Sequence, residues 1–268
     1  MTQDRMQLRA TFDQDALLYD QARPGYPEAL FDDIVTLSAI PSSGRILEIG
    51  CGTGQATLPM ARRGYHIHGI ELGANMAAVA RHNLTAYPLV SIQTDAFEAW
   101  QLEEEAFDLA LSATAFHWID PAISYQKTAQ ALKPSGAMAL FWHEHVKREA
   151  NEGFFEEVIQ IYRREVPEQE EKYGPLLWPD EIAEPVKAEI EQTGLFGPVT
   201  VRRYLWDVTY DAASYLRLLD TYSNHRILDS HRHDRLFRNI AALIDTRYHG
   251  RITKGYLAIL YVAHRKHS

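Results

Sequence analysis

One short stretch, I-L-E-I-G-C-G-T-G-Q at residues 46–55, limits the possible folds of this chain more than any other. An apolar strand runs into three glycines and then into a helical pattern. Glycines at such a junction let the backbone turn sharply, and they let a ligand approach main-chain atoms. Open α/β sheets bind their ligands at this kind of place, beyond the carboxyl end of a strand. The stretch therefore predicts an α/β fold with a ligand site at its sheet edge.

The first half of the chain alternates β-rich runs with helical patterns. Because parallel strands need crossover connections, this alternation predicts a mostly parallel sheet with helices on both faces. The expected strands are 45–49, 66–70, 89–93, 107–111 and 137–142, and the expected intervening helices are 56–63, 74–84 and 124–132.

We expect one domain, 1–268, in which segments before and after the alternating strands and helices extend the fold. Residues 1–40 are expected to form an N-terminal helical cap, with helices at 14–21 and 27–38. Residues 143–197 are expected to leave the sheet as a helical lid or acceptor-site insertion, with helices at 153–166 and 180–193. The last part predicts strands at 199–208 and 255–263, on either side of helices at 212–222 and 230–248.

Charge and composition restrict the partners. The 27 basic and 36 acidic side chains give a net charge of −9, which disfavours a nucleic-acid partner because phosphate contacts need Lys and Arg. Cys51 is the single cysteine, which fits a reducing compartment. The apolar runs are too short to span a membrane, and the start of the chain lacks an apolar secretion signal. We therefore expect a cytoplasmic protein with no membrane partner; the sequence does not indicate an oligomeric state.

The glycine spacing distinguishes between nucleotide sites. The dinucleotide fingerprint G-x-G-x-x-G would need a glycine at position 55, where this chain has Gln55 and places its third glycine at Gly54. The phosphate-binding loop G-x-x-x-x-G-K-[ST] is also absent from the sequence. A nucleoside ligand without phosphates is the better interpretation, although a strand-to-helix turn without a ligand would use the same glycines.

Acidic side chains end or follow the first three predicted strands. Glu71 is placed to accept hydrogen bonds from both hydroxyls of a ribose, as acidic residues do about 20 residues beyond such a loop. Asp95 is placed to accept from an adenine amino group, or else only caps the next turn, and Phe97 would pack on the ring. Glu48 precedes the glycine loop, where a carboxylate would attract an ammonium or sulfonium charge.

With these residues in place, E-I-G-C-G-T-G, G-I-E-L and T-D-A-F resemble the motif series of class I S-adenosylmethionine-dependent methyltransferases, over residues 10–145. The segments Y-D-Q-A-R-P-G-Y-P (19–27) and A-F-H-W-I-D (115–120) resemble the small-molecule branch that includes trans-aconitate methyltransferase-like proteins. The resemblance implies a Rossmann-like seven-stranded sheet whose last strand is antiparallel, with 255–263 inserted beside 199–208.

The resemblance also implies a cofactor site. The expected residues all contact S-adenosylmethionine. Gly50, Gly52 and Gly54 would contact its methionine and ribose portion, Glu71 the ribose, and Asp95 and Ala96 the adenine. Tyr19 and Arg23 would lie over the cofactor, and Ser112 under its methionine chain. Arg23 would pair with the cofactor carboxylate. Pro24 disfavours helix at Arg23, so a surface tyrosine and a solvated arginine remain the alternative for Tyr19 and Arg23.

The acceptor side is less well defined by the sequence. His117 is either a general base or a packed residue beside Trp118. His143 and His145 would share a strand face, but no third ligand has suitable spacing, so we expect no metal. His225, His231 and His233 are expected on solvated surface. Residues expected to contact the substrate are Phe116, Trp118, His143 and Arg226.

The function these motifs predict is in-line transfer of a methyl group to an oxygen, nitrogen or carbon atom of a small molecule, with a carboxylate among the possible acceptors. An anionic acceptor would engage Arg23, Arg217 and Arg226. Two alternatives stay open: a nicotinamide-dependent oxidoreductase, which Gln55 disfavours, and a non-catalytic cofactor-binding protein with the same fold.

Overall fold

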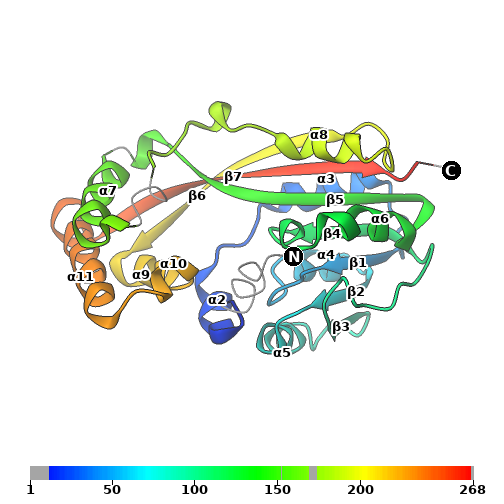
Figure 1. Cartoon of the computed structure of the whole chain (residues 1–268), viewed down its shortest axis with the longest axis horizontal. Helices are drawn as coiled ribbons and strands as arrows, with labels where there is room; N and C mark the ends of the chain where they lie inside the picture. Colours follow the sequence, from blue (N-terminus) through cyan, green and yellow to red (C-terminus); the bar gives the residue numbers. More distant parts are fainter. Residues whose placement is uncertain (1–11, 152, 169–173, 267–268) are drawn as a thin grey trace.

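The computed structural model describes residues 12–151, 153–168 and 174–266 and contains one seven-stranded sheet (Figure 1). The strand order is β3-β2-β1-β4-β5-β7-β6, and β7 runs antiparallel to both of its neighbours, β5 and β6. The Rossmann-like prediction, with the last strand antiparallel and inserted beside the sixth, is confirmed. The strands are β1 (Arg45–Ile49), β2 (His66–Glu71), β3 (Val90–Thr94), β4 (Phe107–Ala113), β5 (Leu132–Val146), β6 (Thr200–Asp211) and β7 (Arg251–His264).

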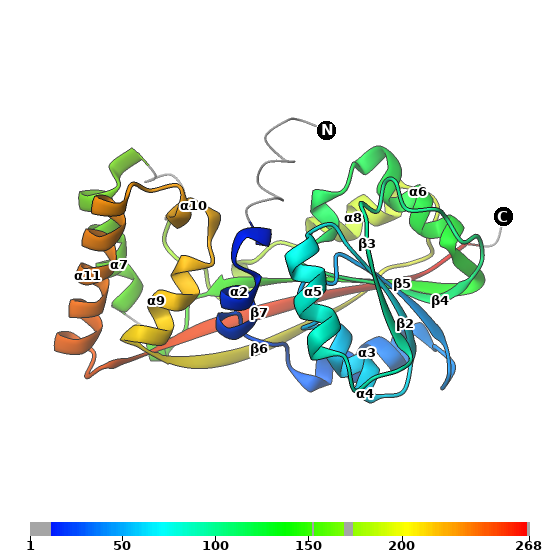
Figure 2. The ribbon, with the colours of Figure 1, turned by 90° about the horizontal axis from the view of Figure 1, so that it is seen from below.

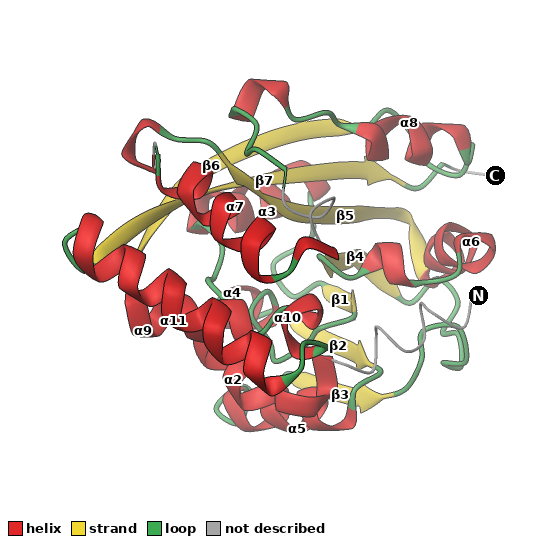
Figure 3. Cartoon of the chain, turned by 60° about the vertical axis from the view of Figure 1, so that its left-hand side comes forward, coloured by secondary structure: helices red, strands yellow, loops and turns green. Residues whose placement is uncertain are grey.

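Helices cover both faces of the sheet, as Figure 3 shows. One face packs on α3, α4 and α5, and the other packs on α6 and α8. The α-helices are α2 (Ala16–Ala22), α3 (Glu28–Ser38), α4 (Thr57–Arg62), α5 (Ala74–Asn83), α6 (Pro121–Ala131), α7 (Phe154–Glu165), α8 (Pro185–Gln192), α9 (Ala212–Asp220), α10 (Ser223–Arg226) and α11 (Ser230–Arg247). The short 3-10 helices are η1 (Phe12–Asp15), η2 (Phe116–Trp118), η3 (Glu149–Asn151) and η5 (Pro179–Glu181).

The central strands are apolar on both sides because both sides are covered. In β1, Ile46 packs into the core beneath α3 and α4, whereas Leu47 packs into the core beneath α6. Both residues are fully buried. Near-continuous apolar runs are typical of parallel strands with two buried faces, and this burial holds the strand ends, and with them the glycine loop, in fixed positions.

The last three strands in the sheet order extend beyond the parallel part. β5, β7 and β6 have 15, 14 and 12 residues, and β6 pairs with β7 from Thr200↔Val262 to Asp211↔Arg251. Their far ends carry α7, α9, α10 and α11, which lie apart from the helices of the parallel part (Figure 2). A third apolar cluster, with Phe154 and Tyr256 fully buried, forms the core there.

The segment 143–197 differs from its expected layout. β5 continues to Val146, so its first four residues are still strand, and α8 packs on the sheet face beside α6. The single helix expected over 180–193 is wrong, because a 3-10 turn and α8 divide it. Pro185 lacks an N–H and restricts the preceding Glu184, which adopts φ −119° and ψ 60°. Gly194, at φ 70°, follows the helix end where a glycine was expected.

No helix in the described ranges combines the length and the apolar character that crossing a bilayer requires.

Candidate active site

A cavity of about 230 Å³ lies at the carboxyl ends of β1, β2 and β4, bordered by the link between α2 and α3. The structure brings most of the predicted site residues to its wall: Tyr19, Arg23, Gly50, Gly52, Glu71, Asp95, Phe97, His117, Trp118 and His143. Six others do not line it: Glu48, Gly54, Ala96, Ser112, Phe116 and Arg226.

The glycine loop forms the floor of this cavity. Gly50 and Gly52 have φ of 71° and 58°, a region that favours glycine. The backbone N–H of Gly50 donates to the carbonyl of Ile70 at 2.8 Å, which ties the loop to β2. A Cβ on Gly50 would stand 2.5 Å from the Cβ of Ala115, so the loop after β4 approaches here too closely for any side chain.

Glu71 joins two loops through its carboxylate. Its Oε2 accepts from the backbone N–H of Gly52, and its Oε1 accepts from that of Gly73, both at 2.8 Å. A carboxylate has about four acceptor positions, so these two bonds do not exhaust it. The arrangement fixes the carboxylate at the cavity edge, where it can also accept from neighbouring ligand hydroxyls.

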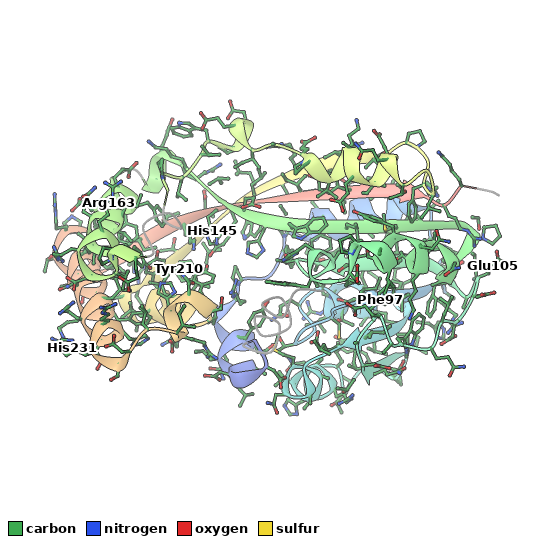
Figure 4. The ribbon with its side chains drawn as sticks, viewed as in Figure 1. Phe97, Glu105, His145, Arg163, Tyr210 and His231 are labelled. Atoms are coloured by element: carbon green, nitrogen blue, oxygen red, sulfur yellow. The ribbon has the colours of Figure 1, made fainter. Side chains whose placement is uncertain are left out.

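Asp95 and Phe97 form the wall beyond β3. The Oδ1 of Asp95 accepts from the N–H of Ala96 at 2.8 Å, so this carboxylate does bond to the following turn, and it also lines the cavity. Phe97 is buried and stacks on Trp100, with ring centroids 6.0 Å apart and an interplanar angle of 15°. Figure 4 shows Phe97 within the parallel part of the molecule. Together they offer a hydrogen-bond acceptor beside an aromatic ring.

Arg23 closes the opposite end. α2 stops at Ala22, as the following Pro24 predicts, and Arg23 caps it with an extended backbone. Its guanidinium lies between two rings, 5.0 Å from the centroid of Tyr19 and 4.4 Å from that of Tyr222. Its Nε is buried and has no hydrogen-bond partner among the described residues. A buried donor of this kind fits an anionic ligand group.

Glu48 lies behind the loop rather than in the cavity. It is 1% exposed, and burial raises the pKa of its carboxyl to about 8, an effect that the Thr57 hydroxyl opposes and the charge of Glu71 increases. Glu48 is therefore not placed to attract a ligand cation, because its carboxyl does not line the cavity and is mainly protonated at neutral pH.

His117 is held as a hydrogen-bond donor. The indole N–H of Trp142 donates to its Nδ1 at 2.9 Å, and an indole nitrogen only donates. The neutral imidazole therefore carries its proton on Nε2. In this arrangement Nδ1 can take a proton only if the Trp142 bond is broken, and the general-base role of His117 stays a prediction.

Three other predicted site residues make structural contacts outside the cavity. The hydroxyl of Ser112 donates to the carbonyl of Ile49 at 2.7 Å and joins β4 to β1. Phe116 is buried against Tyr125, with ring centroids 5.0 Å apart. Arg226 pairs with Asp15 at 3.3 Å, outside the cavity.

One histidine was misplaced by the sequence pattern. His225 was expected on solvated surface, and this is wrong: it is 1% exposed and lies 2.7 Å from the hydroxyl of Tyr162, measured from its Nε2. A helical stretch with several polar residues reads as solvated, but α10 packs inside the cluster formed by α7, α9 and α11.

Sequence reasoning also missed residues on the wall. Tyr26 and Thr114 both line the cavity, and their hydroxyl oxygens lie 3.0 Å apart. Thr114 adopts φ 52° directly after β4, which turns the chain toward the site. Tyr26 lies in the segment 19–27 that carries the resemblance, but nothing in the pattern signals its contact with the loop after β4.

A metal site is not formed by the described part of the chain. No group of three or more His, Cys, Asp or Glu residues there is placed to hold an ion. His143 and His145 do lie near each other, with ring centroids 6.0 Å apart, as alternation along a strand predicts.

The cavity lies at the edge of a doubly wound sheet, where open α/β sheets bind their ligands. Comparisons with known proteins find similar methyltransferases. Residues 47–140 match the family described as "Methyltransferase domain". An uncharacterized methyltransferase of Mycobacterium tuberculosis is 28% identical over 165 residues, which cover 62% of this chain and 64% of that relative's length.

Solved structures share the fold. A putative type II methyltransferase from Anaeromyxobacter dehalogenans gives a TM-score of 0.61 at 22% identity, covering 90% of this chain and 97% of that one. A phosphoethanolamine N-methyltransferase of Haemonchus contortus, solved with S-adenosyl-L-methionine, gives 0.57 at 18% identity, covering 100% and 61%. The chain therefore contains a region similar to a methyltransferase domain, and it shares the fold of solved methyltransferases.

Replacing the bridging carboxylate tests the ribose role. We expect Glu71→Ala to weaken binding of S-adenosylhomocysteine about 10- to 100-fold, since hydrogen bonds to a charged group contribute about 1.5–3 kcal/mol. Isothermal titration calorimetry measures this. Glu103→Ala removes an exposed carboxylate paired with Arg45 and serves as the control. Equal affinity in Glu71→Ala and Glu103→Ala would remove the ribose role.

The buried Glu48 predicts a pH effect on stability. Its pKa of about 8 lies above the usual 4.5, so between these values the folded state holds a proton that the unfolded state releases. Stability from this group therefore falls as pH rises through that window, by up to about 1.4 kcal/mol per unit. Urea unfolding at pH 5 to 8 should show a smaller loss for Glu48→Gln than for the wild type. Parallel pH dependences in the two proteins would contradict the assignment.

The proton position on His117 is directly measurable. Nitrogen-15 NMR of the neutral protein should show the proton on Nε2, because Nδ1 accepts from Trp142. Trp142→Phe removes the indole donor and should shift the ring toward a mixture of tautomers. A proton found on Nδ1 in the wild type would favour the general-base interpretation.

Proposed function

We propose that this protein transfers the methyl group of S-adenosylmethionine to a small-molecule acceptor. The observation that carries the proposal is one cavity that combines the glycine loop, the Glu71 carboxylate and the buried Nε of Arg23. The match of residues 47–140 to a methyltransferase domain supports the same conclusion.

The residues present fit each part of the cofactor. Glu71 would hold the ribose hydroxyls, and Asp95 with Phe97 would hold the adenine. Arg23 would hold the carboxylate of the methionine portion, since its Nε lacks a protein partner in the described chain. The third glycine is Gly54 and position 55 is Gln55, so the dinucleotide spacing is not met, which disfavours the nicotinamide alternative.

The reaction asks little acid–base chemistry of the protein. When bound, the cofactor supplies a sulfonium methyl group whose leaving thioether is neutral. The chain's own residues need mainly to align the acceptor and exclude water. The aromatic faces of Tyr19 and Trp118 on the wall also suit a sulfonium charge.

The wall histidines support an acceptor that is already nucleophilic. Burial, together with the positive charges of Arg23 and Lys254, lowers the pKa of His143 to about 3. His143 is then a weak base at neutral pH, and Nδ1 of His117 accepts from Trp142. This favours an acceptor that is deprotonated at working pH.

The acceptor side is formed by segments beyond the parallel strands. His143, from the segment 143–197, lines the cavity, and Arg23 donates from its Nη2 to the carbonyl of Thr221 at 3.4 Å. We infer that this segment and the residues around α9 and α10 enclose a small acceptor. The trans-aconitate methyltransferase-like branch is part of this proposal.

Methyl transfer is tested with radiolabelled S-adenosylmethionine and a fractionated metabolite extract. The expected result is label in one small-molecule product, lost in Glu71→Ala. Cofactor binding without any labelled product across all fractions would instead favour the non-catalytic binding protein. Failure to bind adenosylhomocysteine would reject both.

A further inference from the structure

A buried lysine stands one layer behind the cavity wall. Lys254 on β7 is 3% exposed, and its Nζ donates to the hydroxyl of Tyr222 at 3.2 Å. The rings of Tyr215, Tyr222 and Tyr256 surround the ammonium, with centroids 5.4 to 5.9 Å from Nζ. Within the described chain, no carboxylate forms an ion pair with it.

Two routes connect Lys254 to the cavity. The Tyr222 hydroxyl lies 3.3 Å from Nε2 of His145, whose ring neighbours that of His143 on the wall. The guanidinium of Arg23, also on the wall, lies over the Tyr222 ring at 4.4 Å. Figure 4 shows His145 and Tyr210 in the middle of the molecule, whereas His231 lies at its outer edge.

The charged groups around Lys254 are all positive. Burial lowers the pKa of Lys254 well below its usual value, and the charge of Arg23 lowers it further. Burial also lowers the pKa of His145, as do the charges of Lys254 and Arg23. The titratable groups near Lys254 on the neighbouring elements are Tyr210, Tyr215, Tyr222, Tyr256, His143, His145, His225 and Arg23. No carboxylate is among these described residues.

An unpaired buried lysine costs stability. Removing an ammonium from water carries a penalty of several kcal/mol, and apolar residues of similar volume often replace buried charges without loss. Packing alone therefore does not call for a lysine at this position. A bound negative charge would compensate Lys254, and it would form charge-assisted hydrogen bonds with the ammonium.

We propose that Lys254 and Tyr222 form an anion-binding subsite that takes a carboxylate or phosphate group of the methyl acceptor, whereas Arg23 beside them is left to the carboxylate of the cofactor. This rests on the proposed methyl transfer and names its substrate class. Lys254 takes the role that Arg217 and Arg226 were expected to share. Arg217 is exposed, and Arg226 pairs with Asp15, so of the three expected arginines only Arg23 reaches the cavity.

Anion binding at this subsite should take up a proton. A negative group beside Lys254 raises its pKa, so anion binding at this buried site favours uptake of a proton. Loss of the uptake in Lys254→Met assigns it to Lys254 and separates the subsite from binding at the protein surface.

The test is calorimetry at pH 8 on the protein saturated with S-adenosylhomocysteine. Formate, acetate, succinate and inorganic phosphate are titrated in two buffers of different ionisation enthalpy. We expect at least one anion to bind with net proton uptake. Lys254→Met should weaken that anion at least about tenfold and abolish the uptake. The control variant Lys187→Met, on the exposed side of α8, should bind the anion with the same affinity as the wild type. The preferred anion distinguishes carboxylate from phosphate.

A structural role predicts different results. If Lys254 only supports the fold, Lys254→Met lowers stability in urea and leaves anion affinity unchanged, whereas the subsite predicts equal or higher stability. Tyr222→Phe provides a second variant and should also weaken the anion. Binding of none of the four anions by the wild type, or equal binding by Lys254→Met, overturns the subsite. Adenosylhomocysteine affinity is measured alongside, and its absence would indicate failure of the proposed function instead.

Discussion

The carboxylate of Glu71 is the constraint on which the proposed site depends. By accepting from the N–H groups of Gly52 and Gly73, it fixes the loop after β1 against the loop after β2. Those loops are in turn positioned by strands buried on both faces, as Ile46 and Leu47 show. The acceptor atoms for a sugar are therefore in place before any ligand arrives, and little ordering remains to be done on binding.

The molecule separates opposite charges along one cavity. Carboxylates of Glu71 and Asp95 stand at the ends of β2 and β3, whereas Arg23 lies at the far end with Lys254 behind it. The far end exists because β5, β7 and β6 extend beyond the parallel part and carry a separate helical cluster (Figure 2). This polarity suits a ligand with a neutral nucleoside at one end and an anionic group at the other.

Local patterns predicted the parallel half of the fold well, because apolar runs, glycines and strand-end acids act over a few residues. They failed where distant segments decide. β5 was ended at Trp142, where the apolar run stops, yet pairing with β7 extends it to Val146. Lys254 was not singled out, because its burial depends on residues distant in sequence. His117 was left as either a base or a packed residue, because its contact with Trp142, 25 positions away in sequence, has no local signal. Pairing and burial set by tertiary structure carry no short-range signal.

The most direct test of the central claim is a crystal structure of the protein with S-adenosylhomocysteine. The account predicts the ribose hydroxyls on the Glu71 carboxylate, the adenine between Asp95 and Phe97, and the ligand carboxylate at Arg23. A ligand bound elsewhere, or one whose sugar makes no contact with Glu71, would contradict it.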